Sequence, residues 1–160
     1  MAGAGITKAV LLALNTEPSG AKYDAVYAGE PLLIRALVAL SKAGIRSARI
    51  ICHEGHREKI AALIGKAGTR IALDYDISPV RTGEMLSGAV SRLVAEWDTS
   101  FLLFEANQVV HPTFFAQFAQ FVGSRKPVLV VYKHDRDVSN PTVREGAQLH
   151  LKHRLICVDR

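Results

Sequence analysis

The chain has 160 residues, the size of one domain, and its 49% apolar and 22% charged residues are typical of a globular protein rather than a disordered one. No apolar run approaches the roughly 18 residues that a helix needs to cross a bilayer, and residues 1–8 lack the apolar core of a secretory signal. We therefore expect a single cytoplasmic domain, residues 1–160, that inserts no segment into a membrane.

The formal net charge is +5, from 20 Lys and Arg against 15 Asp and Glu, and the basic residues are scattered along the chain. A nucleic-acid-binding surface normally shows a basic stripe with interleaved aromatic residues, so we expect no nucleic-acid partner. The same surplus suits small phosphorylated ligands. The two cysteines, Cys52 and Cys157, fall in apolar runs without metal-ligand spacing, which predicts buried free thiols.

The first predicted unit is a strand, a polar loop and a helix. Residues 9–14 form a continuous apolar run, short enough for a strand buried on both faces. Residues 15–22 are rich in Pro, Gly, Ser, Thr and Asn, which break regular structure and leave backbone N–H groups free. Pro31 suits the first position of a helix whose apolar stripe runs to Leu40, and Gly44 suits its end. This order places the loop at the carboxyl end of a strand, where open α/β sheets bind ligands.

The later segments alternate between strands and helices. We predict strands at 48–52, 70–73, 101–104 and 127–132, helices at 54–65, from an N-cap at Thr82 to about Trp97 and from Pro112, polar loops at 74–83 and 133–146, and one or two closing strands within 148–158. Strands that alternate with helices predict parallel βαβ units with right-handed crossovers. The expected fold class is a three-layer α/β/α domain with a mostly parallel sheet.

Residues 9–14 read AVLLAL and residues 21–45 read AKYDAVYAGEPLLIRALVALSKAGI. This frame resembles the nucleotidyltransferase family that couples an NTP to a sugar phosphate or polyol phosphate, which has the nucleotide-diphospho-sugar transferase (Rossmann-like) fold. That family opens with an apolar strand, a glycine-rich loop ending in an arginine, a Pro-Lys pair and a Gly-Lys-Pro-Leu turn. Aligning residues 29–32 with that turn places Lys22 on the family's lysine. Here Ala21 replaces the proline, Glu30 replaces the turn lysine, and the loop lacks the glycines and the arginine.

The resemblance implies attack by an acceptor phosphate oxygen on the α-phosphorus of an NTP, with release of pyrophosphate. Lys22 would balance the charge on the phosphates, as positioning and charge neutralisation require. The loop residues that would cradle the phosphates are Asn15, Thr16, Ser19 and Gly20. Glu17 would repel a triphosphate, so the rival interpretation is a plain loop with a solvated lysine. The residues that resemble the family's turn along the nucleobase and ribose are Arg81, Thr82, Gly83 and Glu84.

The family holds Mg²⁺ on the aspartate of a Gly-Asp pair that ends a strand, and Asn107 stands at that position here. An amide oxygen binds Mg²⁺ without contributing charge, and Glu105 is a substitute carboxylate on the same side of an extended chain. The alternative is that Glu105 and Asn107 only end a strand and bind no metal. Asp135 and Asp137 resemble metal-binding aspartate pairs, but their setting favours a solvated loop.

The sequence contains two histidine pairs with i, i+3 spacing, His53 with His56 and His150 with His153. Neither pair has the carboxylates or cysteines of a zinc site, so we expect surface or strand-edge histidines.

Two functions follow from these observations. The first is a Mg²⁺-dependent nucleotidyltransferase whose partners are an NTP and a phosphorylated sugar or polyol. The chain would then be a pared-down fold or the N-terminal part of a longer protein, like the cytidylyltransferase modules fused ahead of membrane phosphatidyltransferases. The second is a catalytically degenerate domain that binds a nucleotide, a partner domain or itself as a homo-oligomer. The lost loop glycines, the lost arginine and Asn107 favour it. The sequence selects neither the NTP nor the acceptor.

Overall fold

The computed structural model describes residues 6–14, 22–109, 111–123, 129–132, 142–143 and 155–158. The elements in this part of the chain are β1 (Lys8–Ala13), β2 (Val26–Tyr27), β3 (Glu30–Pro31), α1 (Leu32–Lys42), β4 (Ser47–Cys52), the 3-10 helix η1 (Glu54–His56), α2 (Arg57–Ala67), the 3-10 helix η2 (Gly68–Arg70), β5 (Asp74–Pro79), α3 (Leu86–Leu93), β6 (Phe101–Glu105), α4 (Pro112–Gly123), β7 (Leu129–Tyr132), β8 (Thr142–Val143) and β9 (Leu155–Val158). Within the described residues, none of the helices combines the length and the apolar character that a membrane span requires.

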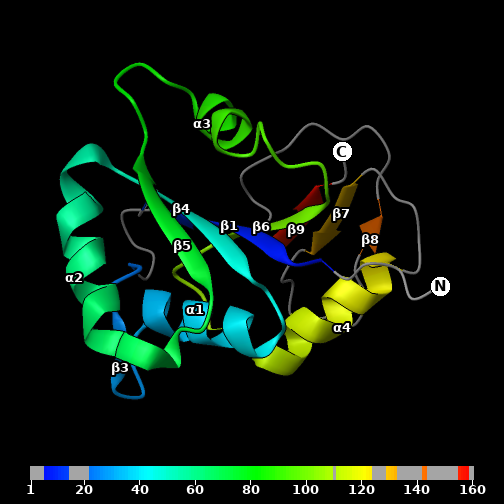
Figure 1. Ribbon diagram of the computed structural model, residues 1–160, viewed down its shortest axis with the longest axis horizontal. Coiled ribbons are helices and arrows are strands. Elements are labelled where there is room, and N and C mark those ends of the chain that lie inside the picture. Colours follow the sequence, from blue (N-terminus) through cyan, green and yellow to red (C-terminus); the bar gives the residue numbers. More distant parts are fainter. Residues whose placement is uncertain are drawn as a thin grey trace.

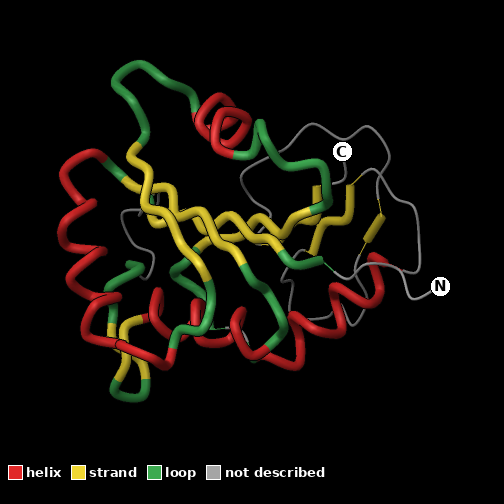
Figure 2. Tube along the Cα trace, in the orientation of Figure 1, coloured by secondary structure: helices red, strands yellow, loops and turns green. Residues whose placement is uncertain are grey.

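In the described part of the chain, seven strands form one sheet in the order β5-β4-β1-β6-β9-β7-β8, and β2 pairs with β3 in a separate hairpin. Strands β5, β4, β1 and β6 are parallel, whereas β9 is antiparallel to both β6 and β7. Helices α1, α2 and α4 lie on one face of the sheet and α3 lies on the other (Figure 1, Figure 2). The structure therefore confirms the predicted three-layer α/β/α architecture with a mostly parallel sheet.

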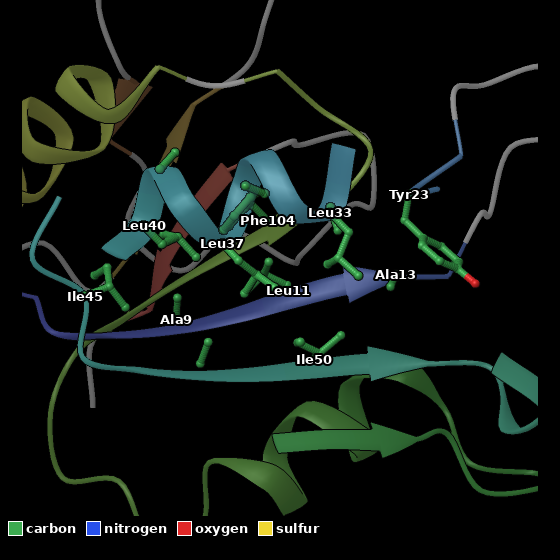
Figure 3. Packing of buried hydrophobic residues seen from close by; sticks show 14 of the residues in the cluster. Ala9, Leu11, Ala13, Tyr23, Leu33, Leu37, Leu40, Ile45, Ile50 and Phe104 are labelled. Carbon is green, nitrogen blue, oxygen red and sulfur yellow. The ribbon is translucent and has the colours of Figure 1, made fainter. Parts of the chain in front are cut away.

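The central strand β1 contributes to a core on each face of the sheet, because successive side chains of a strand point to opposite sides. Leu11 packs in the larger core with apolar residues of α1 (Figure 3), and this core also contains residues of α2 and α4. Val10 packs in the smaller core with Trp97 and the buried face of α3. The strand is buried on both faces, as its continuous apolar run predicts. The predicted strands at 48–52 and 101–104 and the helix at 54–65 are confirmed by β4, β6 and the η1–α2 pair.

Helix α1 begins at Leu32, one residue later than predicted, because Pro31 has an extended ψ of 140° and pairs with β2. At its other end the N–H of Ile45 donates to the carbonyl of Leu40 at 3.0 Å, as in a Schellman motif. Gly44 supplies the required left-handed conformation with a φ of 90°. The predicted helix end is confirmed.

The edge strand β5 lies where the sequence predicts a loop, and the predicted strand at residues 70–73 is wrong. Among the described strands β5 pairs only with β4, which makes it an edge strand. Asp74 and Tyr75 are exposed, and Pro79, which has no N–H to donate, is the last residue of the strand. Such a strand has no continuous apolar run, so it is not predicted from the apolar pattern of the sequence. In the same way, β8 falls within the predicted loop at 133–146.

Candidate functional site

The carboxyl ends of the four parallel strands lie at one edge of the sheet. Ala13 is level with Cys52, Cys52 is level with Pro79, and Leu12 is level with Glu105. Because these strands end together, the segments that follow them meet at this edge. It is the edge at which open α/β sheets bind ligands.

Asn107 lies in the turn after β6, and its side-chain oxygen Oδ1 is buried without a hydrogen-bond donor among the described residues. The side-chain nitrogen Nε2 of the next residue, Gln108, is buried in the same state. An unsatisfied buried polar group costs roughly 1–3 kcal/mol. Native proteins keep few of them, and each calls for an explanation. Two consecutive residues, one with a buried acceptor and one with a buried donor that have no partners among the described residues, therefore mark this turn as a candidate binding site.

Glu105 is the last residue of β6 and its side chain is half-buried. The sequence analysis places Glu105 and Asn107 on the same side of an extended chain. Because the strand ends at Glu105, that alternation does not apply to Asn107. Their oxygens still fit Mg²⁺, which takes one or two carboxylates together with other oxygen ligands. No group of three or more His, Cys, Asp and Glu among the described residues could hold a metal ion. A magnesium site here would therefore depend on these two residues and on oxygens of the substrate.

Lys22 has an exposed side chain that makes no ion pair or hydrogen bond with the described residues. Its backbone carbonyl accepts a hydrogen bond from the N–H of Ala25 at 2.9 Å, which fixes the turn before β2. The ammonium group is close enough to Asp24 to help lower the pKa of that carboxyl, after the larger effect of Lys59. The phosphate-loop candidates Asn15, Thr16, Ser19 and Gly20 lie outside the described residues, as do Asp135 and Asp137.

The turn after β5 contains the predicted nucleobase-bordering residues Arg81, Thr82, Gly83 and Glu84. The Glu84 N–H donates to the carbonyl of Arg81 at 2.9 Å, and the Arg81 N–H donates back to a Glu84 carboxylate oxygen at 2.9 Å. The guanidinium of Arg92 donates to both oxygens of this carboxylate, at 2.9 and 3.0 Å. These hydrogen bonds, first from Arg92 and then from Arg81, lower the pKa of Glu84 from 4.5 to about 2. The carboxylate of Glu84 therefore holds the turn.

Helix α3 begins at Leu86, so the prediction of Thr82 as its N-cap is wrong. Gly83, with a φ of 76°, closes a separate turn that lies between Thr82 and the helix. The helix ends at Leu93 rather than near Trp97, but Trp97 is still buried in the core beneath it.

Two histidines and a tyrosine that the sequence argument leaves without a role also lie at this edge. His53 directly follows β4, and its Nε2 donates to the carbonyl of Leu14 at the end of β1. Nδ1 of His56 lies 3.1 Å from the hydroxyl of Tyr23, and the two histidine rings are 5.6 Å apart. Tyr23 is only 1% exposed and lies beyond Ala13 at the carboxyl end of β1 (Figure 3). The sequence feature that indicates this location is the position of His53 immediately after a buried strand.

The architecture is that of the nucleotide-diphospho-sugar transferase fold. No protein-family model matches the sequence, and no curated protein matches it. Among solved structures, the chain is similar to the inositol-1-phosphate CTP transferase from T. maritima (TM-score 0.61, 11% identity), to a UDP-glucose pyrophosphorylase complexed with UDP-glucose (0.56, 12%) and to the 4-diphosphocytidyl-2C-methyl-D-erythritol synthase from Anaerococcus prevotii (0.61, 9%). The alignments cover 98%, 96% and 97% of this chain and 72%, 74% and 71% of those chains. The resemblance stated from the sequence is thus confirmed as a resemblance of fold.

Proposed function

We propose that this chain is a nucleotidyltransferase domain that transfers a nucleotidyl group from an NTP to a sugar phosphate or polyol phosphate. The observation that carries the proposal is Oδ1 of Asn107, which is buried without a donor among the described residues and lies two residues after Glu105, the end of β6. Support also comes from the fold, since two similar structures are named as a CTP transferase and a UDP-glucose pyrophosphorylase.

In the proposed reaction an acceptor phosphate oxygen forms a bond to the α-phosphorus of the NTP. The bond between the α-phosphorus and the bridging oxygen breaks, and pyrophosphate leaves with the electron pair. Such a step depends on positioning and on charge neutralisation rather than on a covalent nucleophile. Lys22 suits charge neutralisation, because its exposed ammonium group makes no ion pair or hydrogen bond with the described residues.

The remaining roles belong to the segments after β1, β5 and β6. Asn15, Thr16, Ser19 and Gly20 would hold phosphate oxygens. Arg81, Thr82 and Gly83 would border the base, with Glu84 bracing their turn through Arg92. Mg²⁺, held by Glu105 and Asn107, would supply positive charge beside the phosphates. The neutral amide gives this site less charge than an aspartate would, so the affinity for Mg²⁺ should be modest.

Calorimetric titration with CTP, UTP, GTP and ATP, with and without Mg²⁺, tests the proposal. One nucleotide should bind in a metal-dependent manner, and Lys22→Ala should weaken its binding about tenfold or more, the usual effect of losing one charge-assisted hydrogen bond. The matched control is Lys66→Ala, which removes an exposed lysine from α2 and should leave the affinity unchanged. Absence of binding for all four nucleotides would refute the proposal.

A specific observation favours the alternative of a catalytically degenerate domain. Glu30, which replaces the family's turn lysine, is a carboxylate paired with Arg70, so this position offers no positive charge to a phosphate. In that case nucleotide binding would not depend on Mg²⁺, and no acceptor phosphate would cause the NTP to release pyrophosphate.

A further inference from the structure

Three side chains from one short segment contact the two stretches of chain that flank residues 15–21. His53, His56 and Lys59 occur within seven positions, from the end of β4 to the first turns of α2. Their partners are Leu14 on one side, and Tyr23 and Asp24 on the other.

The contact on the first side is between His53 and the last described residue before position 15. Nε2 of His53 donates to the backbone carbonyl of Leu14, which lies one residue beyond the end of β1. An imidazole N–H satisfies this carbonyl whether the ring is neutral or protonated, provided that Nε2 carries the hydrogen. The link therefore fixes the point at which the chain leaves the sheet.

The contact on the second side is between His56 and Tyr23. The Tyr23 hydroxyl lies 3.1 Å from Nδ1 of His56, and its ring is buried beyond the end of β1 (Figure 3). The carbonyl of Tyr23 also accepts a hydrogen bond from the N–H of Leu33 at 2.9 Å, in the first turn of α1. Tyr23 is thus held by its backbone and by its side chain, and it directly follows Lys22.

An ion pair between Lys59 and Asp24 reinforces this second side. The hydrogen bond from Lys59 holds the pKa of Asp24 below its usual range, and Asp24 in turn raises the pKa of Lys59. The ammonium group of Lys59 also lies 5.9 Å from the centre of the Tyr23 ring. One helix start therefore restrains both residues that follow Lys22.

We propose that His53, His56 and Lys59 are positioning residues that hold Leu14 and Tyr23 at a fixed separation and thereby keep Lys22 at the carboxyl edge of the sheet. The restraint of the chain stands on these contacts alone. Only its consequence for nucleotide binding rests on the function proposed above.

Limited proteolysis with trypsin tests the restraint without any nucleotide. Cleavage after Lys22 should become about two- to tenfold faster in His53→Ala, His56→Ala and Lys59→Ala, the range for losing one hydrogen bond when cleavage follows local opening. Cleavage after Arg81, in the exposed turn before α3, serves as the internal reference and should not change. Lys66→Ala should be cleaved like the wild type at both positions.

Conservative variants separate a specific contact from a loss of packing. His53→Gln retains an N–H donor near the position of Nε2, and His56→Asn retains a polar atom near that of Nδ1, so both should restore cleavage after Lys22 to nearly the wild-type rate. Wild-type cleavage in all three alanine variants would overturn the proposal. Equal acceleration at Lys22 and Arg81 would also overturn it, because that result indicates general destabilisation.

The consequence for binding is measured separately, by calorimetry with the nucleotide that binds best in the presence of Mg²⁺. The alanine variants should bind it about tenfold more weakly while they remain folded at the temperature of the titration, whereas His53→Gln and His56→Asn should bind it normally. If the wild-type chain binds no NTP, the proposed function fails, and the proteolysis result still decides whether these three residues position Lys22.

Discussion

Replacing Asn107 with aspartate should make the stability of this chain depend on Mg²⁺. Oδ1 of Asn107 is buried without a donor among the described residues, so a carboxylate at this position would have one oxygen that is buried without a donor among those residues. Leaving even a neutral polar group unpaired costs roughly 1–3 kcal/mol, and an unpaired charge costs more. A loss of about 2 kcal/mol corresponds to a fall of ~4–8 °C in the melting temperature of a chain of this size.

Mg²⁺ should reverse this loss in Asn107→Asp, because the added carboxylate completes a set of ligands of the kind that Mg²⁺ prefers. A ligand that binds only the folded state stabilises it by about 2.7 kcal/mol at a concentration one hundred times its Kd. Thermal unfolding followed by circular dichroism across a MgCl₂ series measures both effects. The melting temperature of the wild type should rise only slightly with MgCl₂, because the amide of Asn107 contributes no charge.

Asn107→Ala is the matched control for this experiment. It removes the unpaired oxygen, so it should be at least as stable as the wild type and should not respond to Mg²⁺. If Asn107→Asp melts at the wild-type temperature without metal, the oxygen is not buried and unpaired. If the variant is destabilised but indifferent to Mg²⁺, residue 107 is not a metal ligand.

Two further predictions concern the turn before α3 and the end of α1. Glu84 has a folded-state pKa of about 2 against an ordinary 4.5, so its ionised form stabilises the fold above pH ~4.5 and this contribution is lost as the pH falls towards 2. The melting temperature of Glu84→Gln should therefore lie below that of the wild type at neutral pH and approach it in acid, whereas a gap that is constant with pH would contradict the ion pair with Arg92. Gly44→Ala should destabilise the chain by about 1–2 kcal/mol in urea unfolding, because Gly44 has a φ of 90°. The matched control Gly65→Ala, in the exposed interior of α2, should instead stabilise it by roughly 0.5–1 kcal/mol, and shifts of the same sign would contradict the reasoning.

The central strands are predictable from the sequence, because a strand buried on both faces reads as a continuous apolar run, as β1, β4 and β6 do. The edge strand β5 is not predictable in this way, since it exposes Asp74 and Tyr75 to solvent. The β2–β3 hairpin also escapes the pattern, because its strands have only two residues each. Its turn uses Ala28 and Gly29 at positive φ, and only the glycine is a signal in the sequence.

The candidate site is predictable in position but not in its contacts. Parallel strands end at one edge, so the segments containing Glu105 and Glu84 are expected there. The bond between Glu84 and Arg92 joins residues eight positions apart, across the turn that precedes α3, and no helical or strand period reveals it. The sequence predicts a surface or strand-edge histidine at position 53, but it does not reveal the contact of His53 with a backbone carbonyl, which no side-chain motif describes.

The two substitutions that most weaken the resemblance to the nucleotidyltransferases have different physical consequences. Glu30, at the position of the family's turn lysine, is paired with Arg70, so its charge is neutralised within the fold. The amide of Asn107 is not satisfied in this way, because Oδ1 has no donor among the described residues. Nε2 of Gln108 likewise has no acceptor among them. A domain retained only for its architecture would gain roughly 1–3 kcal/mol by replacing such groups with apolar ones. Substitutions of that kind are readily found where no function opposes them. The unpaired groups at the end of β6 therefore support a site that binds a ligand over a purely structural role.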